Sequence, residues 1–218
     1  MVVALGRVTV QDVGPLPSRS VSTDSGTMKR PTGWLWLIVV SAAVGMAATV
    51  IQLIERVQLA TNPETSLLCD INATLSCGTV LEAWQSSVFG PIPNAAIGLT
   101  VFTVMLTAAL GVLLGSTLAV RAWGVLAFFA AFMAAFTVWF LYQTTFSIRA
   151  VCLYCLAIGT AVVLINAAWW RVAAASGWLT GPGRFRATAG RWVAGGSDLL
   201  LWAGLWFAVA AMMVIGFN

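Results

Sequence analysis

The chain has four cysteines, and they form two pairs with different spacings. Cys69 and Cys77 lie in the segment LLCDINATLSCGTV, and Cys152 and Cys155 lie in AVCLYCLAIG, where a long apolar stretch begins. A disulfide between two thiols separated by two residues stabilises a fold only weakly, because it closes a very short loop. Such a small ring is better suited to thiol–disulfide exchange. The spacing therefore indicates redox chemistry at Cys152 and Cys155.

The position of this pair at the start of an expected helix supports the same chemistry. Unpaired N–H groups and the positive end of the helix dipole favour a thiolate there, and Arg149 adds positive charge a few residues upstream. Positions i and i+3 share a helix face and differ in depth by about 4.5 Å. We expect Cys152 to lie nearer the water, where it can meet a loop cysteine. Cys155 would lie one turn deeper, where it can meet a bilayer-soluble electron acceptor, for which a quinone is suited.

Two other uses of the four thiols remain open at this point. They could form two structural disulfides in a non-enzymatic membrane scaffold, since most extracytoplasmic cysteine pairs are structural. They could also bind zinc, but the seven-residue spacer between Cys69 and Cys77 and the position of the other pair at the start of a membrane span are unusual for zinc sites. The chain contains no histidine, the commonest metal ligand. We therefore expect no metal site.

The composition indicates an integral membrane protein that is all α-helical. Of 218 residues, 60% are hydrophobic and 8% are charged, whereas soluble domains have about a quarter charged residues. A membrane-spanning helix needs roughly 20 mostly apolar residues. Five segments satisfy this requirement, and they comprise residues 34–54, 95–114, 122–142, 151–170 and 199–217.

The distribution of basic residues predicts the orientation of these helices. With a cytoplasmic N-terminus, the inner segments contain nine Lys and Arg residues and the outer segments contain only Arg56 and Arg149. This bias predicts a multi-pass protein of the cell inner (plasma) membrane with all four cysteines at the extracytoplasmic face, where disulfides persist. The net charge of +4 then reflects contact with anionic lipid at the inner leaflet and not nucleic-acid binding.

The segments outside the spans have distinct compositions. Residues 1–33 contain too little apolar surface to fold alone and are predicted to be a disordered cytoplasmic tail. Residues 55–94 form the extracytoplasmic loop that contains the first cysteine pair. Residues 172–198 are predicted to be a basic cytoplasmic connector on the lipid surface, which leads into the fifth helix at 199–218.

A short amphipathic helix is expected in the outer loop. Thr79 and Glu82 match the capping-box pattern and place its start near Cys77. Val80 begins a series of apolar residues at four-residue intervals, which continues with Trp84 and Val88 and which gives the helix one apolar face. A half-helix of this kind in the membrane interface could cover a pocket between the spans, or it could simply order the loop.

Asn94 follows two prolines and directly precedes the second span. Its simplest role is that of an N-cap for that helix. Its amide would also be one of very few polar groups at that depth, which makes it a candidate for ligand binding. The two roles are compatible.

Together these motifs resemble the vitamin K epoxide reductase family, specifically its bacterial members that oxidise dithiols at the expense of a quinone. The resemblance rests on LCD, on SC eight residues later, on VFG-P-PN-A-IG and on CLYC at the start of the fourth span. It extends from about Trp34 to Trp170. It implies a four-helix transmembrane bundle around a quinone site in residues 34–171, capped by the extracytoplasmic loop and its half-helix, and followed here by the fifth helix.

The resemblance also implies an electron path. Cys69 would take electrons from an external partner, Cys77 would pass them to Cys152, and Cys155 would face a menaquinone or ubiquinone. Asn94 would donate a hydrogen bond to a quinone carbonyl. The implied activity is that of a quinone-dependent thiol–disulfide oxidoreductase that supports disulfide-bond formation in exported proteins.

The ends of the family pattern suggest how the partner is supplied. Many bacterial relatives carry a fused thioredoxin-like domain after the fifth span, whereas this sequence stops at Asn218. We therefore expect a separate extracytoplasmic thioredoxin-fold (DsbA-like) protein as the partner.

Two positions depart from the wider family pattern. Gly159 stands where members of the animal type carry a tyrosine, and Ala83 stands where many members carry a serine. Both differences argue against epoxide reduction and leave quinone reduction unaffected. A second candidate is a DsbB-type quinone oxidoreductase, but in that family the C-x-x-C pair comes first in the chain, whereas here it comes second and begins a helix.

Overall fold

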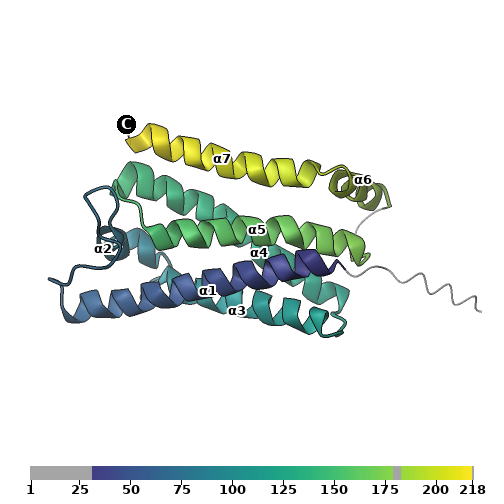
Figure 1. Cartoon of the computed structure of the whole chain (residues 1–218), viewed down its shortest axis with the longest axis horizontal. Helices are drawn as coiled ribbons and strands as arrows, with labels where there is room; N and C mark the ends of the chain where they lie inside the picture. The colour runs from purple at the N-terminus through teal and green to yellow at the C-terminus, as the bar shows by residue number, and fades with distance from the viewer. Residues whose placement is uncertain (1–30, 179–182, 218) are drawn as a thin grey trace, which may run out of the picture.

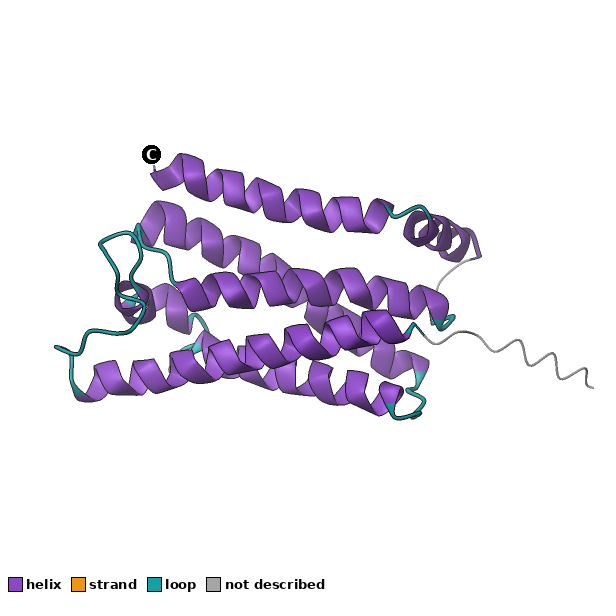
Figure 2. Cartoon of the chain, viewed as in Figure 1, coloured by secondary structure: helices purple, strands orange, loops and turns teal. Residues whose placement is uncertain are grey.

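The computed structural model describes residues 31–178 and 183–217, which form a bundle of helices (Figures 1 and 2). Within these residues five helices are long and apolar enough to cross a membrane. They are α1 (Thr32–Thr61), α3 (Asn94–Leu113), α4 (Val120–Gln143), α5 (Leu153–Ala175) and α7 (Ser197–Phe217). The prediction of an all-α, multi-pass membrane protein is therefore confirmed. Residues 1–30 of the expected N-terminal tail lie outside the described residues.

Helix α1 is longer than its apolar run. The sequence placed residues 55–94 in the loop, but α1 continues to Thr61, so Glu55 and Arg56 are helical. The segment after Ile54 contains good helix formers and continues the helix although it is polar. The helix ends at Asn62, whose backbone is extended and which precedes Pro63. The helical conformation is unfavourable for a residue that precedes proline. The Asn62–Pro63 dipeptide therefore ends the helix, and the charged residue Glu55 does not end it.

The four helices of the bundle are arranged around α1 and α5. Helix α1 packs along both α3 and α5, and α5 also packs against α4, whereas α3 and α4 touch each other only sparsely. The core is apolar, and it includes Ile38, Phe102 and Ala168, which are 0–1% exposed. A Cβ atom at Gly45 would lie 2.5 Å from the Phe102 ring, so the close approach of α1 and α3 requires glycine there.

Helix α7 lies on the outside of the bundle, along α4 and α5 (Figure 1). An ion pair fixes its start, because Arg171 Nη2 lies 2.8 Å from Asp198 Oδ1. Asp198 is in the first turn of α7, where the helix dipole favours an acid. The predicted basic connector at 172–198 is partly helical, since α5 continues to Ala175 and α6 occupies Gly183–Ala194.

The loop between α1 and α3 folds over one end of the bundle and contains two short helical pieces, α2 (Cys77–Glu82) and the 3₁₀-helix η1 (Trp84–Ser87) (Figure 1). The expected helix start near Cys77 is confirmed, but the predicted capping box of Thr79 and Glu82 is wrong. Ser76 is the N-cap, and its Oγ accepts a hydrogen bond of 3.2 Å from Thr79 N. The predicted apolar face also ends early, because Val80 is buried while Trp84 is 67% exposed.

Candidate active site

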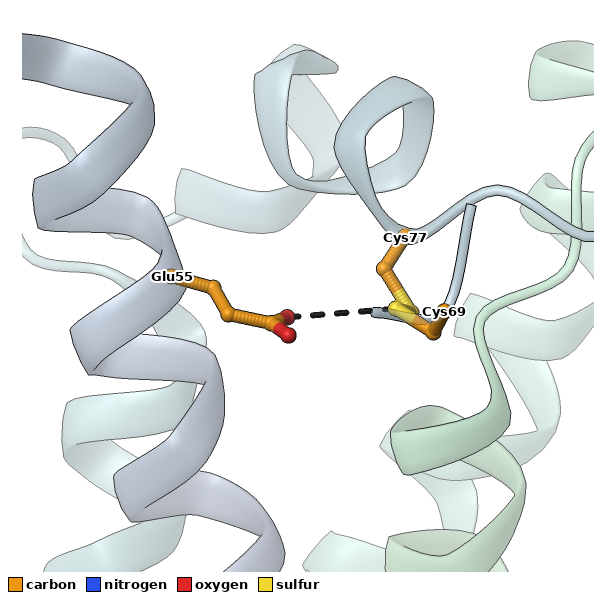
Figure 3. A group of neighbouring side chains, drawn as sticks. All are labelled: Glu55, Cys69 and Cys77. Atoms are coloured by element: carbon orange, nitrogen blue, oxygen red, sulfur yellow. Dashed lines mark hydrogen bonds between the residues drawn. A yellow bond between two sulfur atoms is a disulfide. The ribbon is translucent and has the colours of Figure 1, made fainter. Parts of the chain in front are cut away.

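The loop cysteines are joined in a buried disulfide. Cys69 and Cys77 are 3% and 0% exposed and their Cα atoms are 5.6 Å apart (Figure 3). Both belong to a small apolar cluster at the loop end of the bundle, which also contains Leu81 of α2 and Cys152 of the second pair. The two cysteine pairs are therefore packed into one water-poor environment.

Asp70 organises the backbone around this disulfide. Its carboxylate accepts hydrogen bonds from Gly78 N at 3.0 Å, from Leu67 N at 3.1 Å and from Ser76 Oγ at 2.9 Å. Partial burial alone would raise the pKa of Asp70, but these hydrogen bonds outweigh it and lower the pKa below its usual value. The charged Asp70 carboxylate therefore connects the backbone segments on both sides of the disulfide through its hydrogen bonds.

A backbone bridge joins the loop to the start of α5. Leu75 and Val151 form an isolated parallel bridge, in which Val151 N donates to Thr74 O at 2.7 Å and Ser76 N donates to Val151 O at 3.1 Å. Cys77 follows Leu75 by two positions and Cys152 follows Val151 by one. The bridge therefore sets the register that brings Cys77 to the second cysteine pair, and the sequence analysis did not predict it.

The second pair occupies the first turn of α5 as free thiols. Cys152 is the N-cap residue and is 0% exposed, while Cys155 is half-buried one turn further along. Cys152 lies one turn nearer the loop than Cys155 and packs with the loop cysteines, as expected, but the loop covers it so that it has no direct contact with water. A hydrogen bond from the Cys155 thiol, assisted by the Gln52 amide, lowers the pKa of Cys152 below its ordinary value. The direction agrees with the expected thiolate, but its main cause is the neighbouring Cys155 thiol and not Arg149.

Gln52 of α1 contacts both sulfur atoms of this pair. Its Nε2 donates to Cys155 Sγ at 3.0 Å and to Cys152 Sγ at 3.5 Å, and the side chain is 5% exposed. Sequence reasoning missed this residue. The available signal was a single glutamine within an otherwise apolar span, since polar groups inside a membrane are functional candidates by default.

Glu55, one turn further along α1, points at the loop disulfide (Figure 3). Its carboxylate Oε2 lies 3.9 Å from Cys69 Sγ and the residue is 5% exposed. The Tyr154 hydroxyl, from the turn between the two α5 cysteines, interacts with the same carboxylate. The sequence predicts Glu55 in the outer loop, whereas the structure places it on α1 and within the site.

Glu55, Cys69 and Cys77 also place three potential metal-ligand atoms within 4.8 Å of one another. The two sulfurs are bonded to each other, however, and a zinc site uses the negatively charged thiolate as its ligand. While the disulfide is intact, the two sulfurs are therefore not available as thiolate ligands for zinc.

Beneath the loop, the four bundle helices line a partly open pocket. Its wall is mainly apolar, with the aromatic rings of Phe132, Phe136 and Phe140 on α4. Cys155 and Asn94 supply polar groups to the lining. A largely apolar pocket with a few polar groups is typical of a small-molecule binding site.

Asn94 lies in this wall, but it does not cap a helix. Pro93 is the N-cap of α3 and Asn94 is its first residue, so the N-cap prediction is wrong. The Asn94 Nδ2 atom donates to Gln85 O at 2.6 Å, and Oδ1 accepts from Val88 N at 3.2 Å. The side chain therefore fastens the η1 segment to the edge of the pocket.

Arg56 reinforces the same edge from α1. Its Nη1 donates to Leu81 O at 3.1 Å and to Ser86 Oγ at 2.6 Å, and its side chain also lines the pocket. These contacts attach both short helical pieces of the loop to α1, so that the cover over the cysteines is tied to the bundle.

Helix packing explains why residue 159 is a glycine. A Cβ atom there would lie 2.9 Å from the Trp206 ring of α7 and 3.0 Å from Thr137 of α4. A tyrosine at this position would displace one of these helices. The fifth transmembrane helix therefore occupies the space that a large side chain at residue 159 would need.

Comparison with known proteins agrees with this geometry. The sequence model of the Vitamin K epoxide reductase family matches residues 36–170, which include both cysteine pairs and Asn94. No curated protein matches the chain. The family match covers well over half of the 218 residues and contains almost the whole four-helix bundle. The chain therefore belongs to the vitamin K epoxide reductase family, a family of membrane oxidoreductases.

Proposed function

We propose that this protein is a quinone-dependent thiol–disulfide oxidoreductase that reoxidises an extracytoplasmic thioredoxin-fold (DsbA-like) partner. The observation that carries the proposal is the position of the α5 pair. Cys152 packs in the same buried cluster as the loop disulfide, and Cys155, one turn away, lines the apolar pocket. A two-electron path from the loop to a bilayer-soluble acceptor needs sulfur atoms at both places.

The path begins at the loop. A thiolate of the reduced partner attacks Cys69, the Cys69–Cys77 bond breaks and Cys77 leaves as a thiolate. The second partner thiol then resolves the mixed disulfide, and the partner leaves oxidised. The loop retains two thiols, having gained two electrons and two protons.

Transfer to the second pair follows in two exchanges. The Cys77 thiolate attacks Cys152 in a Cys152–Cys155 disulfide, and Cys155 leaves as a thiolate beside the pocket. Cys69 then attacks Cys77, which reforms the loop disulfide and releases Cys152. The product of these exchanges has a loop disulfide and two free α5 thiols.

The residues around the pocket suit a quinone. The rings of Phe132, Phe136 and Phe140 offer flat apolar surfaces, and the Asn94 amide has two N–H groups, of which Gln85 O engages one. The second N–H would hydrogen-bond a quinone carbonyl. A bound menaquinone or ubiquinone would accept two electrons and two protons. Gln52 would hold the thiolate of Cys155 at the pocket until the Cys152–Cys155 bond reforms.

The proposal includes a location and a domain organisation. The bias of nine basic residues against two supports a cytoplasmic N-terminus and an extracytoplasmic loop in the plasma membrane. The working unit is the bundle at 34–171 with its loop, and the connector and fifth helix follow at 172–198 and 199–218. The loop disulfide is consistent with an oxidising compartment.

The test is anaerobic quinone reduction by the purified protein. Reduced thioredoxin would serve as the protein dithiol and decylubiquinone as the acceptor, with quinone absorbance as the readout and a protein-free reaction as background. Catalytic loss of absorbance is the expected result. In addition, a Cys69→Ser/Cys155→Ser variant should accumulate a Cys77–Cys152 disulfide, detected by peptide mapping. A scaffold with static disulfides would give neither result.

A further inference from the structure

The electron path above leaves one buried acid beside the loop disulfide without a role. We propose that Glu55 is a catalytic proton acceptor, which carries a proton between the two cysteine pairs during disulfide exchange. The inference rests on the proposed function, because it assigns a residue to the transfer from Cys77 to Cys152.

The position of Glu55 suits proton transfer at Cys69. Its Oε2 lies 3.9 Å from Cys69 Sγ, and the carboxylate, Cys69 and Cys77 are all at most 5% exposed (Figure 3). Thiol–disulfide exchange requires a thiolate, so each attacking thiol must lose a proton. Since water has little access to these atoms, the proton needs a nearby protein group.

The other titratable groups that face Glu55 are poorer acceptors. Asp70 approaches it from the loop, but the carboxylate of Asp70 already accepts three hydrogen bonds and its pKa is lowered. Tyr154 approaches it from α5 as a neutral phenol, which has no anionic oxygen with which to accept a proton. The chain has no histidine. Glu55 is therefore the best-placed base at the loop disulfide.

The Glu55 carboxylate interacts with the Tyr154 hydroxyl but, among the described residues, it is paired with no cation. Within residues 31–178 and 183–217, the one ion pair joins Arg171 to Asp198, so no cation is paired with the Glu55 carboxylate. Burying an unpaired carboxylate destabilises a fold. The buried acid is therefore better explained by a chemical role than by a contribution to stability.

The step balances in atoms and electrons. In the mixed disulfide Cys77–Cys152, the Cys69 thiol gives its proton to the Glu55 carboxylate. The Cys69 thiolate attacks Cys77, the Cys69–Cys77 bond forms, the Cys77–Cys152 bond breaks, and the electron pair leaves on Cys152. The proton then returns from Glu55 to Cys152, which packs in the same buried cluster as the loop disulfide. The Tyr154 hydroxyl, which lies between the two α5 cysteines in sequence, interacts with the Glu55 carboxylate and keeps it at this position. Glu55 is again a carboxylate, and the mixed disulfide has been the oxidant.

The test compares Glu55→Gln, Glu55→Asp and the exposed control Glu64→Gln in the full-length protein in lipid nanodiscs. Two dithiols are used, each with decylubiquinone as acceptor. Reduced thioredoxin must use the loop disulfide, whereas dithiothreitol is small enough to reach Cys155 through the pocket. Thermal unfolding of each variant is measured in parallel.

We expect Glu55→Gln to slow the thioredoxin-driven reaction by about 100-fold, as general acid–base catalysis contributes 10²–10⁴, and to preserve most of the dithiothreitol-driven rate. The thioredoxin-driven rate of Glu55→Gln should rise with pH more steeply than that of the wild type, because Cys69 must then lose its proton to solvent. Glu55→Asp should retain an intermediate rate, and Glu64→Gln should match the wild type.

Other outcomes overturn the inference. Wild-type rates and pH dependence in Glu55→Gln would show that no proton passes through residue 55. Equal losses with both dithiols in the Gln and Asp variants, together with a lower unfolding temperature, would assign Glu55 a structural role. An inactive wild type would defeat the proposed function itself, and the inference with it.

Discussion

Replacing Gln52 by leucine should slow the release of Cys155 as a thiolate. The Gln52 amide donates to Cys155 Sγ at 3.0 Å, and this sulfur gains a negative charge when its bond to Cys152 breaks. A hydrogen bond to a charged acceptor contributes about 1.5–3 kcal/mol. At 1.36 kcal/mol per factor of ten, losing it corresponds to a rate decrease of about 10- to 150-fold. The longer contact to Cys152 at 3.5 Å adds little to this value.

The assay is dithiothreitol-driven reduction of decylubiquinone, because part of the rate with this small dithiol bypasses the loop disulfide. Gln52→Met is a second variant that lacks the donor and retains an unbranched side chain, and it should lose a similar factor. Gln58→Leu, at an exposed position of the same helix, is the matched control and should retain the wild-type rate. A decrease of less than about threefold in both Gln52 variants, with unchanged unfolding temperature, would refute the reasoning because it is below the value of one charged hydrogen bond.

Three further predictions concern the loop and the pocket. Cys155→Ala should abolish quinone reduction with either dithiol, whereas Cys69→Ala should block reduced thioredoxin and leave part of the dithiothreitol rate; equal losses in both assays would contradict the assigned order. Asn94→Ala should raise the quinone KM and, because its contacts to the η1 segment disappear, also lower the unfolding temperature. Asp70→Asn should lower stability at neutral pH by roughly 1 kcal/mol. Since the folded-state pKa of Asp70 is lowered, its contribution is present above its usual pKa and is lost as the pH falls, so thermal unfolding should show the two proteins converging in acid.

The helices could be predicted from the sequence because hydropathy reports apolar runs directly. All five predicted spans correspond to helices, but their ends were less accurate, and α1 shows why. Hydropathy marks where apolar residues stop, whereas a helix stops where its backbone can no longer continue. In α1 these points are Ile54 and Thr61, and the difference placed Glu55 and Arg56 in a loop.

The cysteines and Asn94 could be proposed as site residues because their motifs are local in sequence. Gln52, Glu55 and Tyr154 could not, since their roles depend on how α1 packs against α5 and the loop. One local signal was available. Gln52 and Glu55 are separated by three positions, so once the helix is extended past Ile54 they share a face. The bridge between Leu75 and Val151 had no comparable signal, because it joins segments far apart in the chain.

The face of α1 that Gln52 and Glu55 share suggests how the proposed thiol–disulfide exchange is ordered along the helix. Gln52 and Glu55 differ in depth by about 4.5 Å along the helix. The deeper Gln52 contacts the α5 thiols, and Glu55, one turn nearer the end of the helix, contacts the loop disulfide. In the proposed mechanism, one helix thus presents a hydrogen-bond donor where a thiolate is stabilised and a base where a thiol loses its proton. In this mechanism Gln52 and Glu55 act on consecutive disulfide exchanges of one electron pair. A substitution of one residue that makes its exchange rate-limiting should hide the effect of substituting the other residue. The effects of the two substitutions on thioredoxin-driven turnover should therefore not add.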